Sequence, residues 1–229
     1  MDKNYKEDKI KLSVIITAGG SSSRYGKTNK LLEKISGKEV ILHSIDAFLD
    51  INPFEIIVSA SEELEPLILD MTAHIQNLKV VRGGATRQAS VFNALKACSE
   101  PDIVAIHDAA RPLIKKTNIE KCIEKTLETG AAIVAVKAVD TIKKVDEHNK
   151  IVETPNRDFL WCVQTPQIFD YKMILSIHQK LEGQNFSDDS GMAEYLGHDV
   201  YVVEGDYTNI KITTKKDIYL AQMLMNEEV

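Results

Sequence analysis

Runs of almost uninterrupted apolar residues alternate with helical patterns through the first part of the chain. The runs lie at residues 14–16, 55–60, 79–81, 103–106 and 131–136. Strands that are apolar on both faces need cover on both faces, which is typical of a mostly parallel sheet between two layers of helices. The alternation therefore predicts an α/β protein with a Rossmann-like, three-layer fold.

Capping residues predict where several helices begin. Thr86 has the position of an N-cap, and Thr117 with Glu120 has the spacing of a capping box. Ser187 is expected to cap a short helix. Late in the chain, the sequence NIKIT at residues 209–213 predicts a last strand before a C-terminal helix.

The apolar pattern stops before residue 140. Residues 140–161 are polar, with short β-like pieces on either side of a turn, and are predicted to form a β-hairpin that leaves the body of the domain. We call this segment the arm. Residues 1–11 form a charged tail without the apolar core of a secretory signal. Because no repeat, low-complexity segment or linker interrupts the chain, residues 1–229 are predicted to form a single domain.

The charge balance and the cysteine usage restrict the class of protein. The net charge is −6, from 34 acidic and 28 basic side chains, which argues against nonspecific binding to nucleic acid. No apolar run approaches the length that a transmembrane helix needs. The three cysteines are widely separated, without a CxxC pair, and the six histidines lack metal-ligand spacing. We therefore expect a cytoplasmic protein without a nucleic-acid or membrane partner.

A small-residue loop with three cations follows the first apolar run. In SVIITAGGSSSRYGKTNK (residues 13–30), the strand breaks at an alanine, two glycines and three serines. Glycines let the backbone approach a ligand closely, and successive backbone N–H groups can form an anion-binding nest. Arg24, Lys27 and Lys30 then add three positive charges. The stretch is typical of polyphosphate binding, but its spacing matches neither the P-loop of NTPases nor the dinucleotide fingerprint.

Further candidate residues follow the other predicted strands. Ligands of an open parallel sheet bind beyond the carboxyl ends of its strands, so these residues are expected to share one edge. The edge combines cations, adjacent glycines and one well-placed acid, Asp108. Its other candidates are Arg82, Gly83, Gly84, Arg87, Ser90, Arg111 and Lys211.

These residue types favour phosphoryl-type transfer, in which positioning and charge neutralisation carry catalysis. The sequence shows no nucleophile elbow with a partner base and no carboxylate pair for glycoside hydrolysis. An attacking phosphate monoester is already ionised at neutral pH, so no general base is required. Each candidate also has an ordinary structural alternative, with Asp108 as a helix cap, Gly83 and Gly84 as a turn, and Lys211 as a solvated strand residue.

Several motifs resemble known enzymes. The pattern A-G-G-x-S-x-R-x-G at residues 18–26, followed by a lysine, is similar to the signature of the nucleotide-sugar type of nucleotidyltransferase. HDAARP at 107–112, QTPQ at 164–167 and NIKIT at 209–213 resemble the 2-C-methyl-D-erythritol 4-phosphate cytidylyltransferase family. The resemblance runs over nearly the whole chain from Leu12 onward. It implies an enzyme of the non-mevalonate isoprenoid pathway that makes a CDP-linked methylerythritol.

The same resemblance implies a homodimer that uses CTP and a divalent cation such as Mg²⁺, with the arm reaching across the dimer. Arg24 and Lys30 would stabilise the pentacoordinate transition state at the α-phosphate. Asp108 would lie near the ribose and the metal-bound phosphates. The residues implied to hold the methylerythritol phosphate are Thr141, Arg157 and Lys211. The residues implied to hold cytidine are Thr17, Ala18, Gly19, Gly20, Gly83, Gly84 and Ser90.

Three alternatives remain open. Ribitol 5-phosphate cytidylyltransferase, a teichoic-acid enzyme, has the same fold. A nucleotide-sugar glycosyltransferase would need a D-x-D metal motif, which the sequence lacks. A non-enzymatic nucleotide-binding module would not need Arg24, Lys30 and Lys211 together. Release of pyrophosphate from CTP in the presence of different polyol phosphates separates these alternatives.

Overall fold

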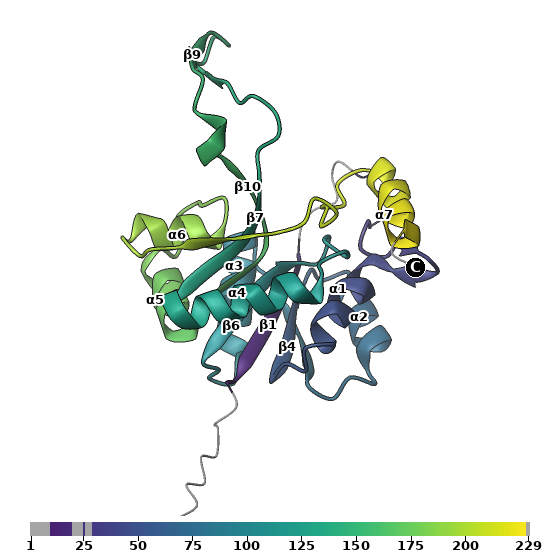
Figure 1. Ribbon diagram of the computed structural model, residues 1–229. Helices are drawn as coiled ribbons and strands as arrows, with labels where there is room; N and C mark the ends of the chain where they lie inside the picture. Colours follow the sequence, from purple (N-terminus) through teal and green to yellow (C-terminus); the bar gives the residue numbers. More distant parts are fainter. Residues whose placement is uncertain (1–9, 20–24, 26–28, 228–229) are drawn as a thin grey trace, which may run out of the picture.

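A mostly parallel sheet of seven strands forms the centre of the molecule (Figure 1). The computed structural model describes residues 10–19, 25 and 29–227. The strand order is β11-β7-β10-β6-β1-β4-β5, and only β10 runs antiparallel to its neighbours. The strands are β1 (Leu12–Ala18), β4 (Glu55–Ala60), β5 (Leu78–Arg82), β6 (Ile103–Asp108), β7 (Ala131–Lys137), β10 (Trp161–Asp170) and β11 (Tyr201–Glu204).

Helices cover both faces of this sheet, which confirms the predicted three layers. They are α1 (Val40–Leu49), α2 (Glu65–Thr72), α3 (Arg87–Ala97), α4 (Lys116–Thr129), α5 (Tyr171–Lys180), α6 (Asp189–Tyr195) and α7 (Lys215–Glu227). Alternate residues of β1 serve different faces, because Val14 and Ile16 belong to one apolar core and Ile15 to the other. The first core includes α1, α2 and α4, and the second includes α3, α5 and α6. Among the described residues, no helix is long and apolar enough to cross a membrane.

Strand β10 is absent from the sequence prediction, and half of its buried positions are polar. Gln164, Thr165 and Gln167 are all buried, and the pairing of β10 with β7 shifts register between Val163 and Gln167. The buried amide of Gln167 donates to Asp188 Oδ2 at 2.8 Å. A prediction based on apolar patterns does not detect a strand that buries hydrogen-bonded polar side chains.

The strand predicted at residues 209–213 is wrong, because this segment is irregular backbone. The Ile212 N–H donates to the Ala110 carbonyl at 2.8 Å, and the Asn209 carbonyl accepts from the Arg111 guanidinium at 2.8 Å. These individual hydrogen bonds to the residues after β6 take the place of a strand ladder. They hold the segment, with its lysine, across the carboxyl end of the sheet.

The structure changes two of the three predicted helix caps. Thr86 caps α3 as predicted, since its hydroxyl accepts a backbone N–H of the first turn. Helix α4 already includes Thr117, so the expected capping box does not form. Helix α6 is capped by Asp188 instead of Ser187, and the Asp188 carboxylate accepts a backbone N–H at 3.2 Å.

The arm projects from the sheet between β7 and β10, as predicted (Figure 1). Short strands β8 (Lys144–Val145) and β9 (Ile151–Glu153) pair antiparallel within it, and the 3₁₀ turn η1 (Arg157–Phe159) follows. Nearly all of its side chains are exposed, including the apolar ones. A second small pair, β2 (Lys34–Ile35) with β3 (Lys38–Glu39), precedes α1.

Candidate active site

A cavity of about 410 Å³ opens at the carboxyl edge of the central strands. Its walls come from the ends of β1 and β6, from the start of α3, and from residues 30–31 and 211. The lining residues are Thr17, Gly19, Lys30, Leu31, Ala85, Thr86, Arg87, Ser90, Asp108, Ala110 and Lys211. The structure therefore brings together six residues of the predicted site, namely Thr17, Gly19, Lys30, Ser90, Asp108 and Lys211.

Asp108 lies at the end of β6 among three cations. Its Oδ2 is 2.8 Å from Lys211 Nζ and 3.7 Å from Arg111 Nε. Its Oδ1 is 3.8 Å from Arg87 Nε. Burial alone would raise the pKa of this carboxyl, but the neighbouring positive charges outweigh burial and hold the pKa well below its usual range. Asp108 is therefore an anion throughout the neutral pH range.

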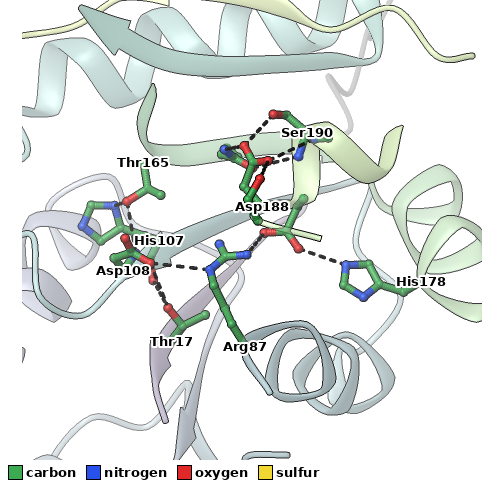
Figure 2. A network of polar contacts seen from close by, with 12 residues as sticks. Thr17, Arg87, His107, Asp108, Thr165, His178, Asp188 and Ser190 are labelled. Atoms are coloured by element: carbon green, nitrogen blue, oxygen red, sulfur yellow. Dashed lines mark hydrogen bonds and ion pairs between the residues drawn. The ribbon is translucent and has the colours of Figure 1, made fainter. Parts of the chain in front are cut away.

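A buried polar network behind Asp108 fixes its position (Figure 2). The Thr165 hydroxyl accepts the Asp108 N–H at 3.1 Å and lies 3.0 Å from His107 Nδ1. His107 Nε2 donates to the Arg111 carbonyl at 3.0 Å, so Nδ1 is the acceptor for the threonine. Thr17 Oγ1 donates toward Asp108 Oδ1 at 3.3 Å. Burial lowers the pKa of His107 to about 4, which keeps this ring neutral at pH 7.

Arg87, in the first turn of α3, lies between two carboxylates (Figure 2). Besides its contact with Asp108, its Nη1 is 2.8 Å from Asp189 Oδ2. Asp189 is fully buried at the start of α6 and also accepts a hydrogen bond from His178 Nε2 at 3.0 Å. Burial would lower the pKa of Arg87, but the charges of the two carboxylates outweigh burial and raise it. An ionic chain therefore runs from the cavity wall into the interior.

Ser90 packs against the glycines of two loops. Its Oγ accepts the Gly84 N–H at 3.0 Å. A Cβ atom at Gly19 or Gly83 would lie about 3.1 or 3.0 Å from this oxygen, and a Cβ atom at Gly84 would collide with Ala89. The small residues therefore let the two loops and the start of α3 meet closely beside the cavity.

Other edge candidates have structural partners. Arg82 Nε pairs with Glu65 Oε2 at 2.6 Å on the exposed surface. Ala18 is buried at the end of β1, where it pairs with Ala60 of β4. Neither Arg82 nor Ala18 is among the residues that line the cavity.

Several residues considered for the site are not among those that line the cavity. Gly20, Arg24 and Lys27 fall outside the described residues. Thr141 and Arg157 lie on the arm and do not line the cavity. Arg157 Nη1 donates instead to a backbone carbonyl of the arm's own base at 2.7 Å. The structure thus separates the predicted site into a cavity in the body and two residues on the arm.

Sequence reasoning missed two contributors to the cavity's architecture. Thr165 orients the Asp108 backbone, and Asp189 holds Arg87, which the sequence had already placed at this edge. The QTPQ run and the pair of acids at 188–189 are visible in the sequence, but nothing in their local pattern places them beside β6. Only the antiparallel insertion of β10 brings them there.

The family resemblance is confirmed by sequence comparison. The profile of the 2-C-methyl-D-erythritol 4-phosphate cytidylyltransferase family matches residues 12–227. The chain is 40% identical over 227 residues to the protein of that name from Caldanaerobacter subterraneus subsp. tengcongensis. The match covers 95% of this chain and 100% of the relative. The chain is 43% identical over 216 residues to the one from Clostridium tetani, which covers 91% of this chain and 87% of the relative.

Solved structures agree with this result. The 4-diphosphocytidyl-2C-methyl-D-erythritol synthase of Anaerococcus prevotii superposes with a TM-score of 0.85 at 33% identity, covering 95% of this chain and 99% of that one. The 2-C-methyl-D-erythritol 4-phosphate cytidylyltransferase of Thermus thermophilus gives a TM-score of 0.79 at 29% identity, covering 95% and 100%. These matches support the isoprenoid reading over the ribitol-phosphate and glycosyltransferase alternatives. The chain belongs to the 2-C-methyl-D-erythritol 4-phosphate cytidylyltransferase family.

Proposed function

We propose that the protein transfers the cytidylyl group of CTP to 2-C-methyl-D-erythritol 4-phosphate and releases pyrophosphate. A phosphate oxygen of the polyol attacks the α-phosphorus of CTP and forms a new P–O bond. The bond from the α-phosphorus to its bridging oxygen breaks, and the electron pair leaves on pyrophosphate. The attacking phosphate is ionised near neutral pH, so no protein base has to remove a proton.

The observation that carries this proposal is the cavity itself. Among the described residues its one lining carboxylate is Asp108, which lies among Lys211, Arg87 and Arg111. A cavity with this excess of fixed positive charge suits a triphosphate and a phosphate monoester. It offers positioning and charge neutralisation, which are the main contributions a protein makes to phosphoryl-type transfer.

The catalytic roles follow from the positions of the cations. Lys30 lines the cavity and is proposed to stabilise the negative charge that develops at the α-phosphate. Arg24 is proposed to share this role from the family signature. Lys211 is proposed to bind the phosphate of the polyol, whose two negative charges would compete with Asp108 for the ammonium group.

The nucleoside is proposed to lie against the small residues of the cavity. Thr17, Gly19 and Ser90 line this part of the wall, and the Gly83–Gly84 turn packs against Ser90. Their lack of bulk exposes backbone N–H and C=O groups, which can recognise the edges of a cytosine base. Ala18 and Gly20 are proposed to contribute from the family signature. Asp108, held by Thr17 and Thr165, is proposed to face the ribose.

A divalent cation such as Mg²⁺ is proposed as the cofactor. Within the described residues, no group of three or more His, Cys, Asp or Glu side chains is arranged to hold a metal ion. Mg²⁺ is commonly bound by one or two carboxylates together with substrate phosphates, and Asp108 on the cavity wall fits that donor set. When bound, the ion would neutralise charge on the triphosphate.

The arm is proposed to complete the site in a homodimer. Arg157 and Thr141 are exposed, and neither lines the cavity of its own chain. In a two-fold symmetric dimer each arm can supply them to the neighbouring cavity. We also propose a cytoplasmic location, since Cys98, Cys122 and Cys162 are all free thiols.

The test is an assay of pyrophosphate release with CTP and a polyol phosphate. We expect turnover with 2-C-methyl-D-erythritol 4-phosphate, formation of the CDP-alcohol by mass spectrometry, and loss of activity with a chelator. ATP, GTP and UTP serve as controls for the base, and ribitol 5-phosphate for the acceptor. Equal turnover of ribitol 5-phosphate, or activity that survives chelation, would contradict the proposal.

A further inference from the structure

Asp189 does not line the cavity, but it contacts Arg87, which does. The Asp189 side chain is 0% exposed, yet its Oδ2 is 2.8 Å from Nη1 of Arg87, which does line the cavity. Its Oδ1 accepts a hydrogen bond from His178 Nε2 at 3.0 Å. Among the described residues, Arg87 is therefore the one link between Asp189 and the cavity.

His178 fixes the second oxygen of this carboxylate. Its ring is fully buried in α5 and lies parallel to the Phe92 ring of α3, at 6.0 Å between centroids and 20° between planes. A carboxylate only accepts hydrogen bonds, so the proton of the pair is on His178 Nε2. Asp189 is thus held by α5 on one side while it holds α3 on the other, and its carboxylate has little freedom to turn.

The arrangement sets the plane of the Arg87 guanidinium. Its Nη1 faces Asp189 and its Nε faces Asp108 Oδ1 at 3.8 Å, so opposite parts of one rigid fork meet two carboxylates. Without Asp189, Asp108 would be the nearest remaining anion for Arg87. The guanidinium would then move toward Asp108, which already contacts Lys211 and Arg111.

We propose that Asp189 is a positioning residue of the nucleotide cavity, where it holds Arg87 at the distance from Asp108 that leaves room for CTP. The identity of the ligand rests on the function proposed above, whereas the action of Asp189 on Arg87 does not. The competing explanation is that the buried ion pair only stabilises the packing of α6. Buried pairs are a weak source of stability, because the desolvation of both charges offsets their attraction.

The chain offers a matched control for this distinction. Glu55 is a second buried carboxylate that holds a cation, with its Oε2 2.8 Å from Lys79 Nζ, but it begins β4 at the opposite edge of the sheet. Asp189→Asn and Glu55→Gln each replace a buried carboxylate by its amide. At Asp189 the amide N–H₂ group would face a donor, either from Arg87 or from His178. Both variants are expected to lose stability, and only Asp189→Asn is expected to change the cavity.

The first measurement is CTP binding by calorimetry together with steady-state kinetics. In Asp189→Asn the Kd and KM for CTP should rise roughly 10-fold, within the range seen for coupled neighbours, while KM for the polyol phosphate changes by less than about twofold. Glu55→Gln should keep the wild-type Kd and KM for CTP, although its Tm falls by about as much as that of Asp189→Asn. Equal constants for Asp189→Asn and wild type, or an equal rise in Glu55→Gln, would overturn the proposal.

A double-mutant cycle tests whether Asp189 acts through Arg87. In an Arg87→Gln background, Asp189→Asn should add no further rise in the Kd for CTP, whereas independent roles would multiply the two effects. If Asp189→Asn does not fold, Arg87→Lys replaces it in the binding assay. A lysine keeps the charge but cannot span two carboxylates, so it should also raise the Kd roughly 10-fold. An unchanged Kd in Arg87→Lys would contradict the proposal.

A crystal structure of Asp189→Asn separates this inference from the proposed function. We expect the Arg87 guanidinium to lie closer to Asp108 than 3.8 Å. An unmoved guanidinium would refute the positioning role whatever nucleotide the enzyme uses. Failure of the wild-type protein to bind CTP would refute the proposed function and leave the structural result to decide the role of Asp189.

Discussion

The cavity and the arm differ in how far their side chains are buried. In the cavity, the Asp108 side chain is only 11% exposed, and strands, helices and a buried threonine hold its partners in place. On the arm, Phe159 is 80% exposed and Ile151 is 56% exposed, and the strands of the hairpin are only two or three residues long. One region is organised by the interior of its own chain, and the other lies outside that interior.

This difference in burial indicates which contacts hold each region in place. Exposed apolar surface marks sites of association, and an isolated two-stranded hairpin is at best marginally stable in water. The arm therefore needs contacts that the described part of its own chain does not provide, which agrees with the proposed dimer. The cavity needs no such help to position Asp108, Arg87 and Lys211.

The largest effect is expected inside the cavity, at the lysine proposed to act on the transition state. Lys30→Ala should lower kcat by roughly 10²-fold or more. The substitution removes a positive charge whose interaction with the α-phosphate becomes strong only in the transition state. Lys27→Ala is the control, three positions earlier in the sequence, and should behave nearly as wild type. Steady-state kinetics with both variants decides the assignment, and the reverse ranking would show that the catalytic lysine is Lys27.

Complementation between variants tests whether the arm serves the other subunit. Arg157→Ala damages the arm and Lys30→Ala damages the cavity, so each homodimer should be nearly inactive. A mixed dimer would contain one intact cavity facing one intact arm. Random assortment of equal amounts makes half of the dimers mixed, each with one working site, so about a quarter of wild-type activity should return.

The control for this experiment is the exchange of subunits itself. Mass spectrometry of differently labelled chains must show mixed dimers before activity is compared. If mixed dimers form and activity stays at the level of the single variants, the arm serves its own chain. The contrast between a cavity that its own chain orders and an arm that depends on a second chain would then be wrong.

The last effect is on stability rather than on activity, and it belongs to the buried network behind the cavity. The pKa of His107 is lowered by burial from 6.5 to about 4. Because the folded-state pKa is depressed, the stability due to neutral His107 is complete above pH 6.5 and is lost as the pH falls toward 4. The linkage amounts to about 3 kcal/mol of unfolding free energy by pH 4.

Chemical denaturation of wild type and His107→Gln between pH 7 and 4 measures this loss. The glutamine can still donate to the Arg111 carbonyl and accept from Thr165, so the variant should fold and should be less sensitive to acid than wild type. His148→Gln, a matched change on the exposed arm, should follow the wild-type curve. Parallel pH curves for wild type and His107→Gln would contradict a buried neutral histidine.

Much of this edge could be predicted because parallel strands leave few choices for their loops. Once β1 and β6 are recognised as neighbours in a parallel sheet, Thr17 and Asp108 must end at the same edge, and they pair in the register. Lys211 was placed there for the wrong structural reason, because its segment is not a strand. Its 2.8 Å contact with Asp108 depends on hydrogen bonds that have no signature in the sequence.

The sequence by itself determined the layered sheet, the separate arm and the family. Apolar runs such as residues 103–106 have to be buried on both faces, and this requirement is visible locally. Tertiary structure alone decided the insertion of β10 and the chain of contacts from Asp108 through Arg87 to Asp189. These features depend on polar groups that are stable in the interior only when a partner from a distant segment meets them, and local sequence patterns do not encode which segment that is.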